Sequence, residues 1–367
     1  MKAAVLYEAH KPLVIEDVTI DGPRDGEVLA RVVATGACHS DYHVMDGSWH
    51  GSNFPMPVVL GHEAAGIVEK VGPGVTSVKP GDHVIMSFAP SCGRCKRCSG
   101  GQPHLCQSMS GGRGTMYDGS RRIRRGNDLL YHFGGGMSSF AELSLLHESQ
   151  AVKVRKDIQL DRAALIGCAI MTGVGAVLNT ARVEPGATMA VFGTGGVGLS
   201  VVQGGVLANA SRIIAVDLKA NKLAYAREMG ATDTINASDA DPVDAIKEIT
   251  GGQGVDYAFD AIGFASVSRQ CYDVTRRGGT TVVVGMAPTG QEIPIPATIP
   301  GEEKIVKGCF YGSTRPQIDF PRLVDFYLAG KLKIDQMLTR RYKFDEINES
   351  FDALHRGDNA RGVIMLS

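Results

Sequence analysis

The sequence predicts an α/β protein of two domains, one of which is built on a doubly wound parallel sheet. The pattern changes near residue 160, from short strands to strands that alternate with helices, and a glycine-rich turn joins an early strand of this second region to a helix. Strands that alternate with helices form βαβ units and a parallel sheet. With 367 residues, the chain is also too long for one ordinary core.

The region before residue 160 is expected to be mostly β. Three apolar runs of strand length, separated by Gly and Pro, are MKAAVLY, EVLARVVATG and AAGIVEKVG. Residues 108–136 are rich in Gly, Arg and Ser, so we predict a long surface loop there. After about residue 310 the pattern changes again and ends in a predicted helix, FDEINESFDALHRG, and a predicted strand, RGVIMLS.

The region between these parts alternates regularly. The predicted strands are ATMAVFG, RIIAVD, TDTINA, VDYAFDAIG and TTVVVG. The predicted helices are GVGLSVVQGGVLANA and KANKLAYAREMG, and the second of them ends on Gly230.

Composition restricts the class of function. The formal net charge is -1, with 44% apolar and 21% charged residues, which is ordinary for a soluble protein. It gives no reason to expect nucleic acid or a membrane as a partner. We identify no apolar run near the roughly 18–20 residues that span a bilayer. The N-terminus has the pattern of a strand and not of a signal peptide, so we expect a cytoplasmic protein.

Four cysteines lie close together in one stretch. Cys92, Cys95, Cys98 and Cys106 follow the pattern C-x2-C-x2-C-x7-C. Four thiolates at such spacing suit a tetrahedral zinc whose coordination shell is filled by protein, which stabilises a loop and leaves no position for substrate. An iron–sulfur cluster is an alternative with similar spacing, and a cysteine-rich loop without metal is another.

A second set of metal ligands is scattered along the chain. Cys38 lies in ATGACHSDYH, His62 and Glu63 lie in LGHEAAG, and Cys168 lies in LIGCAIMTG. A lone Cys is usually a small buried hydrophobe. Two Cys and one His with a fourth position open, however, form a catalytic zinc set, in which zinc polarises an alcohol oxygen and lowers its pKa.

The stretch VFGTGGVG carries a dinucleotide-binding fingerprint. Gly193, Gly195 and Gly198 form G-x-G-x-x-G between a predicted strand and a predicted helix, and the next strand ends in Asp217, 19 residues after Gly198. The glycines permit a tight turn and let a pyrophosphate approach the helix N-terminus. Asp217 would bond the ribose 2′-OH and repel a 2′-phosphate, which favours NAD over NADP.

Together these motifs resemble the zinc-dependent medium-chain alcohol dehydrogenases along the whole chain. The stretches that carry the resemblance include KAAVL, GACHSDYH, LGHEAAGIVEKVGPGV, the four-cysteine loop, GCAIMTGVGA, GTGGVG and FDEINESFDALHRG. The resemblance implies a GroES-like β-barrel-type catalytic domain of residues 1–169 and 311–367, with a Rossmann NAD-binding domain of residues 170–310. It also implies two zinc ions per chain and a homodimer or homotetramer.

The resemblance further implies roles for the matched residues. Cys38, His62 and Cys168 would hold the catalytic zinc, with Glu63 beside it and Asp41 orienting His62. Ser40 would take the alcohol proton and pass it through the nicotinamide ribose to His43. The residues implied to contact NAD are His39 and Arg361 at the pyrophosphate, Lys222 with Asp217 at the adenosine ribose, Thr172 and Val197 near the nicotinamide, and Gly196 in the glycine-rich turn.

Three aromatic residues, Trp49, Phe88 and Phe133, match positions that line the substrate pocket in relatives, although ordinary core packing is the alternative. Aromatic walls favour a primary aromatic, furan-type or aliphatic alcohol, or the matching aldehyde. Cys168 and the loop GGRGTMYDGSRR resemble the liver-type and glutathione-linked branch. Ser110 stands where a basic residue for the glutathione carboxylate is expected, with Arg113 nearby, so a plain alcohol ranks first.

Two other hypotheses stay open. In the first, the chain would be a dehydrogenase of a formaldehyde–thiol adduct; in the second, it would be a non-catalytic homologue that binds zinc and nucleotide. The second of these should have lost a zinc ligand or a relay residue. Here the three ligands, Ser40 and His43 are all present.

Overall fold

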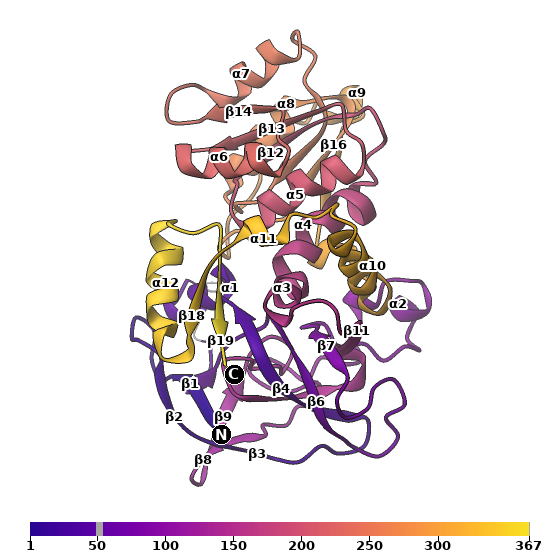
Figure 1. Ribbon diagram of the computed structural model, residues 1–367. Coiled ribbons are helices and arrows are strands. Elements are labelled where there is room, and N and C mark those ends of the chain that lie inside the picture. Colours follow the sequence, from indigo (N-terminus) through magenta and orange to yellow (C-terminus); the bar gives the residue numbers. More distant parts are fainter. Residues whose placement is uncertain (49–53, 367) are drawn as a thin grey trace. The chain divides into compact units, whose positions relative to one another are not determined.

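The computed structural model describes residues 1–48 and 54–366. By its internal contacts the chain divides into unit 1, Met1–Cys168 with Arg315–Ser367, and unit 2, Ala169–Thr314 (Figure 1). Ala169 and residues 311–314 thus belong to unit 2, whereas we predicted them in the first domain. Gly312 packs closely within unit 2, where a Cβ built on it would lie only 2.3 Å from the Met171 carbonyl oxygen.

Unit 1 is built on two β-sheets. One has the order β2-β1-β5-β9-β8-β3, and the other has the order β11-β7-β6-β4-β19-β18, with β10 also paired to β4. Their strands are β1 (Lys2–Leu6), β2 (Val14–Asp17), β3 (Thr19–Ile20), β4 (Glu27–Gly36), β5 (Val58–Val59), β6 (Ala64–Val71), β7 (His83–Met86), β8 (Ile123–Arg125), β9 (Asp128–His132), β10 (Leu143–His147), β11 (Ala151–Val154), β18 (Leu338–Lys343) and β19 (Arg361–Met365). The three predicted N-terminal strands are confirmed as β1, β4 and β6.

The core of unit 1 includes the predicted C-terminal helix. This helix, α12 (Ile347–Arg356), lies beside β18 and β19 and buries Ile347, Phe351 and Ala353 (Figure 1). The buried positions recur at helical spacing, so one face packs on the core while the other meets water. The helix ends at Gly357, whose φ of 71° is the left-handed conformation that glycine adopts readily.

The prediction of a surface loop over residues 108–136 is wrong. The segment contains β8 and β9, and it buries Met116, Ile123 and Leu130. It also buries Arg122, which is 1% exposed and is held by Glu27 at 3.2 Å and Asp21 at 3.0 Å. The composition suggested that this segment is exposed to solvent. The charge of this arginine, however, is neutralised by acidic side chains about 100 residues away in the chain.

The sequence analysis also missed a long helical run. Leu160–Ala181 comprises α3 (Leu160–Leu165), a π-helical turn (Ile166–Ile170), α4 (Met171–Gly175) and a second π-helical stretch (Ala176–Ala181). By length and composition it is apolar enough to cross a membrane, contrary to our expectation, but 83% of its most apolar window is buried inside the protein. Its apolar side chains are therefore used for internal packing, as in the core helices of many soluble proteins.

Unit 2 contains one six-stranded sheet of order β14-β13-β12-β15-β16-β17, and every recorded strand pairing in it is parallel. Its strands are β12 (Thr188–Phe192), β13 (Arg212–Asp217), β14 (Asp233–Asn236), β15 (Val255–Asp260), β16 (Thr275–Val283) and β17 (Ile305–Gly308). The connecting helices are α5 (Gly196–Leu207), α6 (Ala220–Met229), α7 (Pro242–Ile249) and α8 (Ala265–Val274). Right-handed crossovers place α5 and α6 on one face and α7 and α8 on the other, which confirms the predicted doubly wound sheet.

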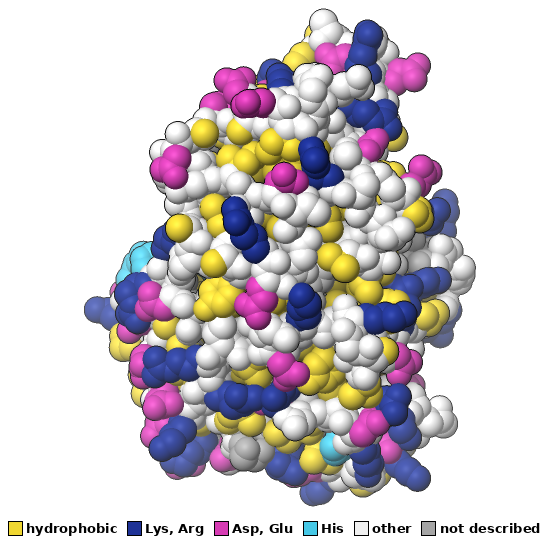
Figure 2. Space-filling model, turned by 45° about the horizontal axis from the view of Figure 1, so that its top comes forward, with side chains coloured by type: hydrophobic (Ala, Val, Ile, Leu, Met, Phe, Trp, Pro, Cys, Tyr) yellow, Lys and Arg dark blue, Asp and Glu magenta, His cyan; other side chains and the backbone are white. Residues whose placement is uncertain are grey.

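The remaining helices are short or lie late in the chain. They are α1 (His39–Met45), α2 (Lys96–Ser99), α9 (Ile299–Glu302), α10 (Pro316–Leu328) and α11 (Ile334–Met337). On the face drawn in Figure 2, Lys and Arg side chains are interspersed with Asp and Glu, as the net charge of -1 leads one to expect. No large field of one sign covers that face.

We expect Arg122→Met to destabilise unit 1 by about 3–5 kcal/mol, because it leaves the buried Glu27 carboxylate without the cation that balances its charge. Arg31→Met is the matched control. Arg31 pairs with Glu69 on the surface, where both side chains are more than a third exposed, and its loss should cost less than about 1 kcal/mol. Urea denaturation followed by circular dichroism measures both, and equal shifts of the midpoint would contradict the prediction.

Candidate active site and metal centres

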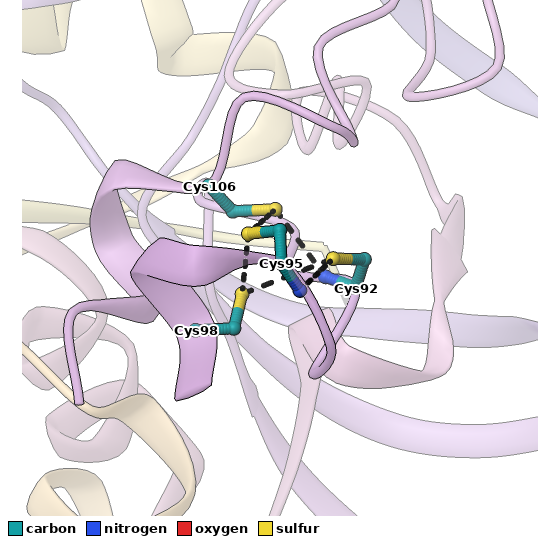
Figure 3. Close-up of side chains that lie close together, drawn as sticks. All are labelled: Cys92, Cys95, Cys98 and Cys106. Atoms are coloured by element: carbon teal, nitrogen blue, oxygen red, sulfur yellow. Dashed lines mark hydrogen bonds between the residues drawn. The ribbon is translucent and has the colours of Figure 1, made fainter. Parts of the chain in front are cut away.

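The four predicted cysteine ligands of unit 1 converge in space. They lie in a loop around the short helix α2, and Gly93 and Gly101, with φ of 71° and 77°, form its tight turns. The backbone N–H of Cys92 donates to Cys106 Sγ at 3.4 Å, and that of Cys95 donates to Cys92 Sγ at 3.3 Å (Figure 3). The loop therefore aims all four sulfurs at one point.

The distances between these sulfurs fit a single tetrahedral ion. The Sγ atoms lie 3.5 Å apart for Cys95 and Cys98, 3.8 Å for Cys95 and Cys106, and 4.0 Å for Cys92 and Cys98. Four sulfurs about 2.3 Å from one zinc are about 3.8 Å apart, whereas a cluster of several iron atoms spreads its ligands further. The backbone N–H groups of Arg94 and Cys95 lower the pKa of Cys92 to about 6, which favours the thiolate that a metal needs.

The scattered second ligand set also comes together. Cys38 immediately precedes α1, His62 lies between β5 and β6, and Cys168 lies in the π-helical turn after α3. One ligand atom from each lies within 4.8 Å of the other two, and all three residues are buried. A π-helical turn inserts one extra residue into the helical repeat and is frequent at functional sites.

The electrostatics of this set suit a metal. His62 Nδ1 lies 3.1 Å from a carboxylate oxygen of Asp41, whose other oxygen accepts the Gly61 N–H, an arrangement that leaves Nε2 as the ring nitrogen for a metal. Burial alone would lower the pKa of His62, but the Asp41 carboxylate and the Cys38 thiolate hold it well above its usual value. A hydrogen bond from the Cys168 thiol holds the pKa of Cys38 well below its usual value. Two sulfurs and one ring nitrogen thus fit a zinc ion with one open position.

Two glycines that the sequence analysis did not single out allow this packing. A Cβ on Gly36 would lie 2.7 Å from Glu63 Oε2, and a Cβ on Gly134 would lie 2.4 Å from His62 Cβ. Gly134 also has a φ of 60°, which other residues rarely adopt. The sequence shows only that these residues are glycines, and it does not show what approaches them.

A buried ion pair adjoins the same ligands. The Arg361 guanidinium, at the start of β19, donates to the Glu63 carboxylate, and the two side chains are 3% and 0% exposed. Burial opposes the charge, but the Glu63 carboxylate and the Cys38 thiolate raise the pKa of Arg361. The pairing joins residues 298 positions apart in the chain, and no sequence pattern indicated it. Our predictions of Arg361 at the pyrophosphate and of Glu63 at the zinc stay predictions.

Two of the three predicted pocket residues lie at His62. The rings of Phe88 and Phe133 each lie 5.6 Å from the His62 ring and meet it edge-on. Phe54, which the sequence analysis missed, meets Phe133 edge-on at 5.5 Å. Trp49 lies outside the described residues.

The predicted relay residues share one short helix. Helix α1 carries His39, Ser40 and His43, and the rings of His39 and His43 are 6.3 Å apart. Asp41, on the same helix, is buried toward His62, whereas the side chain of His43 is 45% exposed. The helix therefore places Asp41 in the interior and His43 where it meets solvent.

The glycine-rich turn of unit 2 has the form that the fingerprint predicts. Gly193 follows β12 with a φ of 87°, and a Cβ on Gly198 would lie 1.7 Å from the Gly193 carbonyl oxygen. Among the described residues, apart from Gly195 and its two chain neighbours, no atom lies within 4 Å of a Cβ built on Gly195, which leaves room for a ligand to approach. Gly196, Val197 and Gly198 open α5, at the switch point where the strand order reverses between β12 and β15.

Asp217 ends β13 and faces this turn. One of its oxygens accepts the Thr194 N–H at 2.8 Å, and the other accepts the Lys219 N–H. Lys222 lies in the first turn of α6, and Thr172 lies in α4. A residue that we did not predict is Asp260, buried at the end of β15, which accepts the N–H groups of Ile262 and Gly263 and so shapes the loop beside Gly193.

Comparison with known proteins assigns the family. Residues 24–156 match the alcohol dehydrogenase GroES-like domain, and residues 196–329 match the zinc-binding dehydrogenases. The alcohol dehydrogenase class-3 of Cereibacter sphaeroides is 42% identical over 376 residues, which cover 99% of each chain. The chain belongs to the zinc-dependent alcohol dehydrogenases.

Other members of the family are similar over their whole length. The S-(hydroxymethyl)glutathione dehydrogenase of Paracoccus denitrificans is 40% identical to this chain over 377 residues, which cover 99% of each chain. The crystal structure of the benzyl alcohol dehydrogenase of Acinetobacter calcoaceticus matches with a TM-score of 0.93 and 35% identity, covering 100% of this chain and 99% of that one. Membership in the family makes the protein an oxidoreductase that uses zinc and NAD, and it decides against an iron–sulfur cluster.

We expect Cys38→Ser to abolish turnover with little change in NAD affinity, because the cysteine lies in unit 1 and the glycine-rich turn lies in unit 2. Cys271→Ala, at a buried cysteine of unit 2 outside both ligand sets, is the control and should keep its zinc. Metal analysis, turnover and calorimetric titration with NAD test this. Loss of NAD binding together with activity would argue against separate metal and nucleotide sites.

We also expect Asp217→Asn to shift the preference from NAD toward NADP by on the order of tenfold, since it removes a repulsion of about 1–2 kcal/mol. The Asn oxygen can still accept the Thr194 N–H, whereas the amide NH2 cannot accept the Lys219 N–H, so this variant removes the charge and one of the two acceptors. Asp217→Gly removes the charge and both acceptors and should shift the preference further. The ratio of kcat/KM for the two cofactors is the measurement, and an unchanged ratio in both variants would remove Asp217 from this role.

Proposed function

We propose that the protein catalyses reversible hydride transfer between NAD and a primary alcohol or its aldehyde, with an aromatic, furan-type or aliphatic side chain. The observation that carries the proposal is the buried set of Cys38, His62 and Cys168 with the edges of Phe88 and Phe133 against the His62 ring. When bound, zinc would act as a Lewis acid on the alcohol oxygen, and the nicotinamide would accept the hydride.

In this proposal α1 provides the path for the alcohol proton. Ser40 would accept the proton and His43 would receive it and release it to solvent; NAD, when bound, would supply the ribose hydroxyl between them. Ser40 and His43 are three residues apart on α1, a spacing at which side chains share one face of a helix. His43 is exposed enough to release the proton to water. The His39 ring and the Arg361 guanidinium are proposed to contact the pyrophosphate.

The two phenylalanines favour an apolar substrate. The two edge-on rings beside His62 present an apolar surface to a substrate, which suits a benzylic or short aliphatic chain. Such a pocket distinguishes poorly between molecules that differ by one methylene, so we propose broad specificity. The similarity to a benzyl alcohol dehydrogenase supports the aromatic class.

The name of one relative, the S-(hydroxymethyl)glutathione dehydrogenase, favours a second candidate, a dehydrogenase of a formaldehyde–thiol adduct. Against it, the exposed Ser110 offers no cation for a thiol substrate's carboxylate, although the exposed Arg113 lies three residues on. We further propose that the protein is cytoplasmic and forms a homodimer or homotetramer. The position of β17 at the edge of its sheet, where a second copy could add a strand, supports this.

The test is NADH formation at 340 nm with a panel of primary alcohols, with and without a chelator, and with formaldehyde plus glutathione as a separate arm. We expect turnover of benzylic and aliphatic alcohols without thiol, abolished by the chelator. Activity only in the thiol arm would transfer the assignment to the second candidate. A zinc-loaded protein without activity in any arm would contradict both.

A further inference from the structure

Directly after α1, three polar side chains form a chain of hydrogen bonds. His43 Nδ1 lies 2.8 Å from Ser48 Oγ, and Ser48 Oγ donates to Asp46 Oδ1 at 2.6 Å. The second oxygen of Asp46 lies 3.7 Å from the same ring nitrogen. None of these contacts involves the metal ligands.

The direction of the hydrogen bonds follows from the chemistry of the groups. An ionised carboxylate only accepts hydrogen bonds, so the single hydrogen of the Ser48 hydroxyl points to Asp46. The Ser48 oxygen can then only accept from His43, which requires a hydrogen on Nδ1. In the neutral ring the other nitrogen, Nε2, is consequently the one with a free lone pair.

We propose that Asp46 and Ser48 are positioning residues that hold His43 in the Nδ1–H tautomer, with Nε2 as the proton acceptor of the relay. This inference rests on the proposed function, which places His43 at the end of that relay. When Nε2 takes up a proton, a new N–H bond forms there and the ring becomes a cation. The Nδ1–H bond to Ser48 persists, and the nearby Asp46 carboxylate stabilises the charge until Nε2 releases the proton to water.

The turn itself occurs twice in unit 1, which supplies a control. Asp118-Gly119-Ser120 repeats Asp46-Gly47-Ser48, and in both turns the serine N–H and hydroxyl reach the aspartate at 2.9 and 2.6 Å. Within the part of the chain that the structure describes, only Ser48 of the first turn has its hydroxyl hydrogen-bonded to a histidine ring. Ser120→Ala therefore breaks the same turn without touching a histidine.

The experiment compares zinc-loaded variants by the rate of the first turnover, recorded as NADH appears after mixing enzyme with NAD and benzyl alcohol. We expect Ser48→Ala to slow this step about five- to twentyfold, part of the roughly hundredfold effect of a positioned base. Ser48→Thr, which retains the hydroxyl, should recover most of the rate. Ser120→Ala should match the unchanged protein, and zinc content, NAD affinity and KM should be unaffected in Ser48→Ala.

A double-mutant cycle with His43→Gln separates positioning from loss of the turn. If Ser48 acts through His43, adding Ser48→Ala to His43→Gln should produce no further loss. Imidazole buffer should restore part of the rate in His43→Gln and in Ser48→Ala. A Ser48→Ala rate equal to that of Ser120→Ala, with His43→Gln slow, would overturn the inference and leave the relay intact. An unimpaired His43→Gln would overturn the relay and the inference together.

Discussion

The register between β4, β6 and β19 is the constraint on which the active site depends. Gly36 at the end of β4 donates its N–H to the Glu63 carbonyl at 2.7 Å and pairs with Val363 of β19. Cys38 follows β4 by two residues, His62 precedes β6 by two, and Arg361 opens β19. Three hydrogen-bonded strand ends therefore bring ligands and charges from distant parts of the chain to one point.

The same convergence forces charges into the interior, where they must be paired. Asp41 faces His62, and Glu63 holds Arg361. Removing one partner of a buried pair leaves the other charge without compensation, which typically costs about 3–5 kcal/mol. The glycines at positions 36 and 134 leave the space that Glu63 and His62 occupy, because a methyl group at either position would displace one of these side chains. Ligand geometry, charge pairing and backbone packing in this region are thus interdependent.

Local patterns predicted most of unit 2 and singled out the cysteines and the histidine that lie together in unit 1, but they did not predict the long-range pairings. The strand–glycine turn–helix motif and the four-cysteine spacing are short-range signals, and the structure has them where the sequence places them. Arg122 in a predicted loop is buried because Glu27, distant in the chain, neutralises it. The helical run through Cys168 was missed because three glycines lower its helix propensity, while tertiary burial compensates.

The helix α1 shows how a few residues can separate two kinds of chemistry. Residues two apart on a helix do not share a face, so Asp41 points into the buried ligand set while His43 meets solvent. Ser40 lies three residues before His43, on the face that the proposed proton path uses. A group that must orient a metal ligand needs burial, and a group that must release a proton needs water. A helix of seven residues meets both needs, because each residue turns the helix by about 100°. Two side chains that are two positions apart therefore point to different sides, one to the interior and one to solvent.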